Sequence, residues 1–159
     1  MSLITLQISY HITAHSYIFD IGKDPKKPEI FKVIEGDVLR KQNTSAPHTS
    51  HCLANGNIMI STMGDANGNA AGDFILFDKN YECLGTWTKG ERAFCGYDFW
   101  YQPLFNVMIA SEWGAPNLFR RGFESTDIAL EKDYGRRLNV YNWKEQKLID
   151  TIHLGDDGE

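Results

Sequence analysis

The sequence has little basic charge and few cysteines, and each shortage excludes a class of protein. It holds 16 Lys and Arg residues against 21 Asp and Glu residues, a net charge of −5, so a nucleic-acid-binding surface is not expected. The three cysteines are an odd number without a Cys-x-x-Cys spacing, which argues against a disulfide framework. Reduced thiols and a cytosolic location are the simpler interpretation. No apolar run approaches the roughly 18 residues of a membrane helix, so no membrane span is predicted.

Several motifs are missing as well. The start of the chain lacks the basic residues of a signal peptide, and residues 1–15 fit no clear element. Residues 64–73, GDANGNAAGD, lack the Lys-Ser/Thr ending of a phosphate-binding loop. No Glu closes them at the spacing of a calcium-binding EF hand. Residues 64–73 are therefore predicted to form a flexible loop.

What the chain does contain favours β-structure. Aromatic residues make up 13% of the 159 residues and there are 14 glycines, a mixture that suits strands joined by turns. Three segments share one form, in which an apolar strand ends at Asp or Asn and a polar turn leads to a second apolar strand. These segments are 17–34, 74–88 and 138–152. The similar segments 52–61 and 101–110 precede the last two, so the chain repeats a four-stranded unit.

A recurring four-stranded unit is typical of a β-propeller blade. The repeats predict a half blade over residues 16–36 and full blades over 48–89 and 95–155. A loop with a short helix after Ser125 is expected to interrupt the last blade at 112–135, with Asp127 and Glu131 on its exposed side. About two and a half blades cannot close a ring of roughly 4–8, so a piece of a longer protein is expected. The alternative is a small twisted β-sandwich.

The segment from Pro47 to Met63 carries the candidate metal ligands, His48 and His51. The strand is predicted to begin at His51, which leaves His48 in the preceding loop. Side chains three apart in an extended chain point to opposite faces, so both histidines reach one metal only if the loop turns. The alternative is that they are hydrogen-bonded structural residues.

Three further residues are candidates for chemistry. Cys52 would capture a soft metal or a chalcogen species if its thiolate were stabilised, although a buried core position is the simpler interpretation. Asp98 and Glu112 adjoin large apolar residues, and burial there would raise a carboxyl pKa towards general acid or base work. A structural carboxylate is the alternative for both. Trp113 is placed to line a small apolar pocket.

Two long blocks give the chain a family resemblance. HTSHCLANGNIMIS and GYDFWYQPLFNVMIASEWGAPN closely resemble the selenium-binding protein family, over about residues 16–157. The resemblance implies a seven-bladed propeller. It also implies copper-dependent oxidation of methanethiol by oxygen and water to formaldehyde, hydrogen sulfide and hydrogen peroxide. Selenium binding by cysteine is a further implied property.

The chain also departs from that family. Its members are much longer and carry additional cysteines and histidines in N-terminal and C-terminal parts that have no counterpart here. Residues 1–15 are a divergent N-terminal segment by this comparison. A fragment is therefore expected, in which His48 and His51 supply only part of a copper site and which is inactive by itself. The alternative is a non-catalytic fragment that binds selenium or protein partners.

Overall fold

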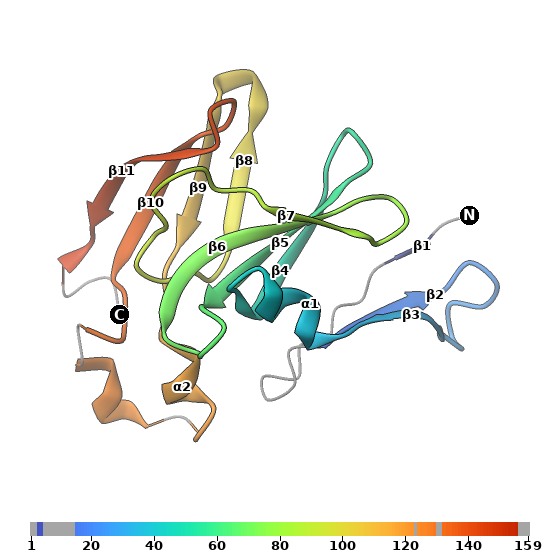
Figure 1. Cartoon of the computed structure of the whole chain (residues 1–159), viewed down its shortest axis with the longest axis horizontal. Helices are drawn as coiled ribbons and strands as arrows, with labels where there is room; N and C mark the ends of the chain where they lie inside the picture. The colour runs from blue at the N-terminus through green and yellow to red at the C-terminus, as the bar shows by residue number, and fades with distance from the viewer. Residues whose placement is uncertain (1–2, 5–14, 123, 130–131, 156–159) are drawn as a thin grey trace.

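Three antiparallel sheets make up most of the molecule (Figure 1). The computed structural model describes residues 3–4, 15–122, 124–129 and 132–155. The first sheet contains β1 (Leu3–Ile4), β2 (Ser16–Asp20) and β3 (Glu29–Ile34). The middle sheet contains β4 (Ser45–Cys52), β5 (Ile58–Gly64), β6 (Ala70–Phe77) and β7 (Cys83–Thr86). The third contains β8 (Phe99–Gln102), β9 (Val107–Ser111), β10 (Arg137–Asn142) and β11 (Lys147–His153).

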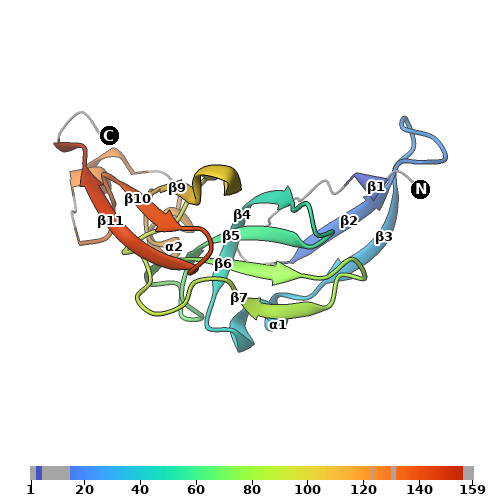
Figure 2. The same ribbon diagram turned by 90° about the horizontal axis from the view of Figure 1, so that it is seen from above.

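The strands of each sheet pair in chain order, as in propeller blades. Figure 2 shows the sheets following one another, with the middle sheet between the other two. The prediction of an all-β, partial propeller with four-stranded blades is confirmed. The middle and third sheets span 45–86 and 99–153, against predicted blades of 48–89 and 95–155.

The middle sheet is buried on both faces. Successive residues of β5 point to opposite sides, so Ile58 and Ile60 pack towards the first sheet while Met59 packs towards the third. The first cluster also contains Ile18, Ile34, Leu39, Ile75, Phe77 and Tyr81. The second also contains Phe74, Trp87, Ala93, Phe99, Met108, Ala110 and Tyr141. These two cores hold the three sheets together.

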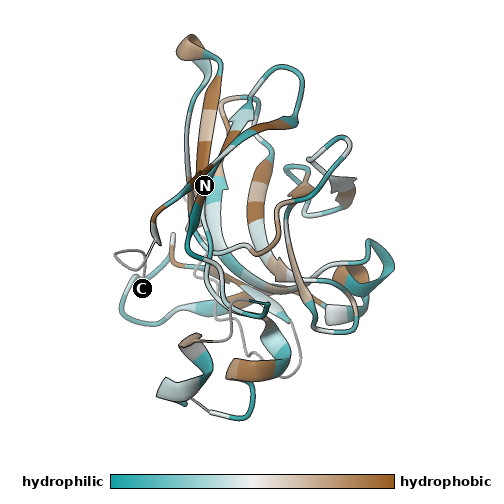
Figure 3. Cartoon of the chain, turned by 90° about the vertical axis from the view of Figure 1, so that its left-hand side faces the viewer, coloured by the Kyte–Doolittle hydropathy of each residue, from teal (hydrophilic) through white to brown (hydrophobic). Residues whose placement is uncertain are grey.

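The outer face of the third sheet is apolar and exposed. Trp100, Ile109 and Ile152 are 74%, 43% and 46% exposed, and Figure 3 shows hydrophobic stretches on the strands viewed from this side. In the described part of the chain, no helix has the length and apolarity needed to cross a bilayer.

Two segments differ from the prediction. Residues 36–50, which precede the strand predicted to begin at His51, contain helix α1 (Gly36–Lys41) and the start of β4. Leu39 is buried in the first core, and this packing stabilises a helix too short to form by itself. The flexible loop predicted at 64–73 is a compact turn. Asp65 Oδ1 accepts the N–H groups of Asn67 and Asn69, both at 2.9 Å, and β6 follows directly.

The connections within the last blade contain three short helical turns. They are the 3₁₀ turn η1 (Pro103–Phe105), helix α2 (Pro116–Phe119) and the 3₁₀ turn η2 (Ser125–Ala129). Of these, η2 lies where the short helix was expected, whereas η1 belongs to the β8–β9 turn. The prediction that Asp127 is exposed is wrong, because its side chain is buried in an ion pair with Arg121. Glu131 lies outside the described residues.

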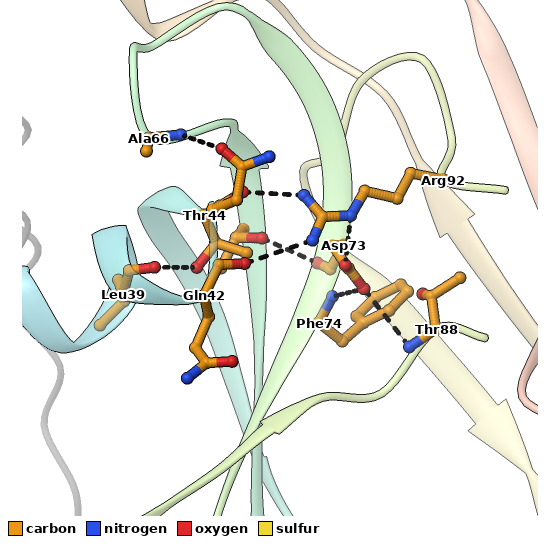
Figure 4. A network of polar contacts seen from close by, with 10 residues as sticks. Leu39, Gln42, Thr44, Ala66, Asp73, Phe74, Thr88 and Arg92 are labelled. Atoms are coloured by element: carbon orange, nitrogen blue, oxygen red, sulfur yellow. Dashed lines mark hydrogen bonds and ion pairs between the residues drawn. The ribbon is translucent and has the colours of Figure 1, made fainter. Parts of the chain in front are cut away.

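A buried ion pair ties β6 to the end of α1 (Figure 4). Asp73, whose side chain is fully buried, has Oδ2 2.8 Å from Nε of Arg92. The contact is electrostatic, because Oδ2 accepts no aligned hydrogen bond from the described residues. The same guanidinium donates to the backbone oxygens of Gln42 and Asn43 at 3.3 and 2.8 Å. Burial raises the pKa of Asp73, so Arg92 offsets a charge that its surroundings disfavour.

We expect Arg92→Met to lower the free energy of unfolding by about 3 kcal/mol, because it leaves the Asp73 carboxylate buried without a cation. Urea denaturation at neutral pH measures the change. The matched control is Arg40→Met, which removes the exposed pair between Arg40 and Asp37 and should change little. Equal effects of the two substitutions would contradict the role given to Asp73 and Arg92.

Candidate metal centre

Both candidate histidines lie on β4, and a bulge turns them towards the same neighbour. Pro47 pairs with Thr62 and Ser50 pairs with Ile60, so β4 has two residues where β5 has one. The extra residue shifts the alternation of side chains by one position. His48 and His51 would point to opposite faces of a regular strand, but both rings here contact the segment 97–101. The expected loop at His48 is therefore a strand with a bulge.

Aromatic side chains surround the two imidazoles. The ring of His48 lies 4.0 Å from that of Tyr97, measured between centroids. The ring of His51 lies 4.6, 5.2 and 5.6 Å from the rings of Phe99, Trp100 and Tyr101. Both histidines are half-buried. The histidines come from the middle sheet. The aromatic wall consists of Tyr97, in the segment before β8, and of Phe99, Trp100 and Tyr101 on β8, so packing of the middle sheet against this part of the chain builds the site.

The pair fits part of a metal site. Imidazole nitrogens are suitable ligands for copper, and two of them face one wall. Within the described ranges, no group of three or more His, Cys, Asp or Glu side chains is arranged to hold a metal ion. His48 and His51 are therefore fit to contribute two ligands rather than to form a complete centre.

Cys52 lies beside the pair but on the other face of β4. It pairs with Ile58, whereas His51 pairs with Met59, and its side chain is exposed. The expectation of a buried core position for Cys52 is wrong, because the strand ends there and turns into solvent. Cys95 is the buried thiol, and burial together with the nearby Glu112 carboxylate raises its pKa to about 12. Cys52 is thus the more accessible of the two thiols.

Asp98 does not have the buried environment expected for a general acid or base. Its side chain is exposed, and Oδ1 accepts the N–H of Phe99 at 2.7 Å. It borders a shallow hollow of about 300 Å³ on the outer face of the third sheet, together with Trp100 and Leu138. The large apolar neighbours leave the carboxylate open to water, because that face of the sheet is uncovered.

The side chain of Glu112 is buried as expected, and it makes polar contacts with three neighbouring residues. Its Oε1 accepts hydrogen bonds from Asn139 Nδ2 at 2.9 Å and from the N–H of Cys95 at 3.5 Å. Oε2 lies 3.9 Å from Arg137 Nε and accepts no hydrogen bond from the described residues. Burial raises the pKa of Glu112. Cys95 lies in the segment before β8, whereas Asn139 and Arg137 belong to β10. Glu112 therefore joins the segment before β8 to β10, and none of these contacts involves β4.

Sequence reasoning missed two residues next to the histidines. Tyr97 was visible as part of an aromatic cluster, but its contact with His48 depends on how the sheets pack. Ser61 is a buried hydroxyl within the apolar strand β5. A serine next to a threonine in an otherwise apolar strand is a weak signal, and only the position of Ser61 opposite the bulge distinguishes it.

A family model described as 56kDa selenium binding protein (SBP56) matches residues 4–159. The chain belongs to this selenium-binding protein family. It is 49% identical over 150 residues to a protein of Xenopus laevis named methanethiol oxidase, covering 92% of this chain and 32% of that protein. It is 43% identical to selenium-binding protein 2 of Mus musculus, covering 91% of this chain and 31% of that protein.

A solved structure supports the same relationship. The hypothetical selenium-binding protein of Sulfolobus tokodaii matches with a TM-score of 0.80 and 31% identity, covering 91% of this chain and 32% of that chain. This member of the selenium-binding protein family therefore spans about a third of the length of the curated relatives it matches. The family prediction made from the HTSHC and GYDFW blocks is confirmed.

The pH dependence of stability tests the burial of Glu112 in this member of the selenium-binding protein family. Because its pKa is raised above 4.5 in the folded state, the folded state binds the proton more readily than the unfolded state. The free energy of unfolding therefore falls as pH rises from about 4.5 through the folded pKa. Asp73 adds to the same trend. We expect Glu112→Gln to lose less stability than wild type between about pH 4 and pH 8 in urea titrations. Identical slopes would show that Glu112 is not desolvated.

Proposed function

We propose that the chain supplies a histidine pair to the copper centre of a cytosolic methanethiol oxidase. The observation that carries the proposal is the bulge in β4, which brings His48 and His51 to one aromatic wall. Relatives named methanethiol oxidase, such as that of Xenopus laevis, support the reaction. In the whole protein, methanethiol, oxygen and water give formaldehyde, hydrogen sulfide and hydrogen peroxide.

The residues of this chain have separate roles in the proposal. His48 and His51 hold the copper through their imidazole nitrogens. A redox-active copper ion supplies the electron-transfer and oxygen chemistry that side chains lack. Tyr97 lies against His48 and in turn contacts Trp113, with ring centroids 4.8 Å apart. This aromatic surface excludes water beside the ligands and suits a small apolar thiol.

The remaining copper ligands are proposed to come from outside this chain. The absence of a three-ligand group among the described residues supports this, as does the share of the relatives' length that the chain spans. The described hydrogen bonds of the Glu112 carboxylate go to Asn139 and Cys95, and that of the Asp98 carboxylate goes to Phe99. The proposal therefore gives these two carboxylates a structural role.

A second candidate function is selenium binding without catalysis. The exposed thiol of Cys52 favours it, because capture of selenium requires an accessible sulfur atom. The relative named selenium-binding protein 2 supports the same chemistry. An uncovered apolar face on the third sheet would then serve contact with protein partners.

Copper binding distinguishes the first function. We expect the 159-residue chain to bind copper at neutral pH without oxidising methanethiol, because only part of the ligand set is present. His48→Ala and His51→Ala should each weaken copper binding roughly tenfold or more, and each tenfold corresponds to about 1.4 kcal/mol. Calorimetric titration and metal analysis after dialysis provide the measurement. His153→Ala, at an exposed histidine on β11, is the control. Unchanged binding in both β4 variants would overturn the assignment.

Selenium incorporation distinguishes the second function. With selenite and glutathione we expect mass spectrometry to locate selenium at Cys52, because Cys95 is buried with a pKa of about 12 and reacts poorly as a thiol. Cys52→Ser should lose the label, while Cys95→Ser should keep it. Labelling that survives in Cys52→Ser would remove the support for this candidate.

A further inference from the structure

The hydroxyl of Ser61 lies at the centre of the contacts that arrange His48. Ser61 is 1% exposed and belongs to β5. Its Oγ accepts the backbone N–H of Thr49 at 3.0 Å and donates to the backbone oxygen of Tyr97 at 2.6 Å. One buried hydroxyl thus joins β4 to the segment that leads into β8.

The first of these bonds stabilises the bulge. Pairing of Pro47 with Thr62 and of Ser50 with Ile60 leaves His48 and Thr49 opposite Ser61 alone. A bulge takes backbone groups out of the regular ladder, and a buried N–H without a partner is costly. The Ser61 hydroxyl receives the Thr49 N–H in place of a backbone oxygen, so it satisfies the group that the bulge displaces.

The second bond places the neighbour of the His48 ring. By donating to the Tyr97 oxygen, Ser61 fixes the backbone of the residue whose ring is 4.0 Å from that of His48. On the other side, Thr49 Oγ1 lies 3.0 Å from His48 Nδ1. Two residues that contact the imidazole, Thr49 and Tyr97, are therefore bonded through their backbones to one hydroxyl.

We propose that Ser61 is a positioning residue for the imidazole of His48. The proposal rests on the proposed function insofar as His48 is a copper ligand, while the geometry it explains exists in the metal-free protein. Ser61 makes no contact with a reacting group, and it acts through Thr49 and Tyr97. It selects the bulged form of β4, in which His48 and His51 face the same wall.

A neighbouring residue offers a matched control. Thr62 is also on β5, is 0% exposed, and donates its hydroxyl to the backbone oxygen of Asp73 at 3.2 Å. Thr62→Val and Ser61→Ala each remove one buried hydroxyl from the same strand, so their general cost to folding is similar. The two hydroxyls differ in that the bonds of Ser61 go to Thr49 and Tyr97, while that of Thr62 goes to Asp73.

The test uses the full 159-residue chain with and without copper. In the metal-free protein, we expect the nuclear Overhauser effects between the His48 and Tyr97 rings to be lost in Ser61→Ala and kept in Thr62→Val. Ser61→Thr, which retains a hydroxyl, should restore them. Copper titration should show roughly tenfold weaker binding in Ser61→Ala only, the size expected when a residue behind a ligand is removed.

Two outcomes would overturn the proposal. One is persistence of the His48–Tyr97 ring contacts in Ser61→Ala. The other, which needs no variant, is rapid hydrogen exchange of the Thr49 amide in the wild-type protein, since a buried bond to Ser61 requires protection. If wild type binds no copper but the ring contacts depend on Ser61, the copper function fails while the positioning role stands.

Discussion

The segment 87–98 connects the middle sheet to the third sheet and packs closely against β5 and β6. The rest of the site depends on this contact. A Cβ at Gly72 would lie 2.2 Å from the backbone oxygen of Cys95, and one at Gly96 would lie 2.3 Å from that of Thr62. No side chain fits in either place, so only glycine allows the two backbones to meet. A hydrogen bond stabilises this contact, because the Gly72 N–H donates to the backbone oxygen of Ala93 at 3.0 Å. Tyr97 follows Gly96 in the chain, so this contact places Tyr97 beside Ser61 and His48.

The aromatic core between the middle and third sheets maintains this arrangement. Phe74 makes edge-to-face contacts with Trp87, Phe99 and Tyr141 at centroid distances of 5.7, 5.1 and 5.4 Å. Such pairs contribute about 0.5–1.5 kcal/mol each beyond burial of their area. Phe99 also contacts His51. The residues that fasten one blade to the next are therefore also those that enclose the candidate ligand.

The sequence predicts what short-range chemistry determines. The hairpins were predictable because turn residues act locally, as where Asp78 Oδ1 accepts the N–H groups of Asn80 and Glu82. The orientation of His48 was not, because one inserted residue reverses the alternation of β4 and no residue type marks it. Likewise, the exposure of Cys52 and the burial of Asp127 depend on where the strand ends and on the ion pair with Arg121.

The bulge explains why two histidines three apart both face the segment 97–101. The bulge leaves the Thr49 N–H without a backbone partner, and Ser61 offsets this cost by accepting that N–H. The imidazoles are therefore arranged before any ligand binds. Arranging ligands in advance strengthens binding, since little ordering remains to be done when the ion enters. It also makes the pair dependent on both blades, because the bulge belongs to β4 and β5 while the wall belongs to β8 and the segment before it. A strand with the same residues but without the neighbouring blade would therefore lose the aromatic contacts of both histidines.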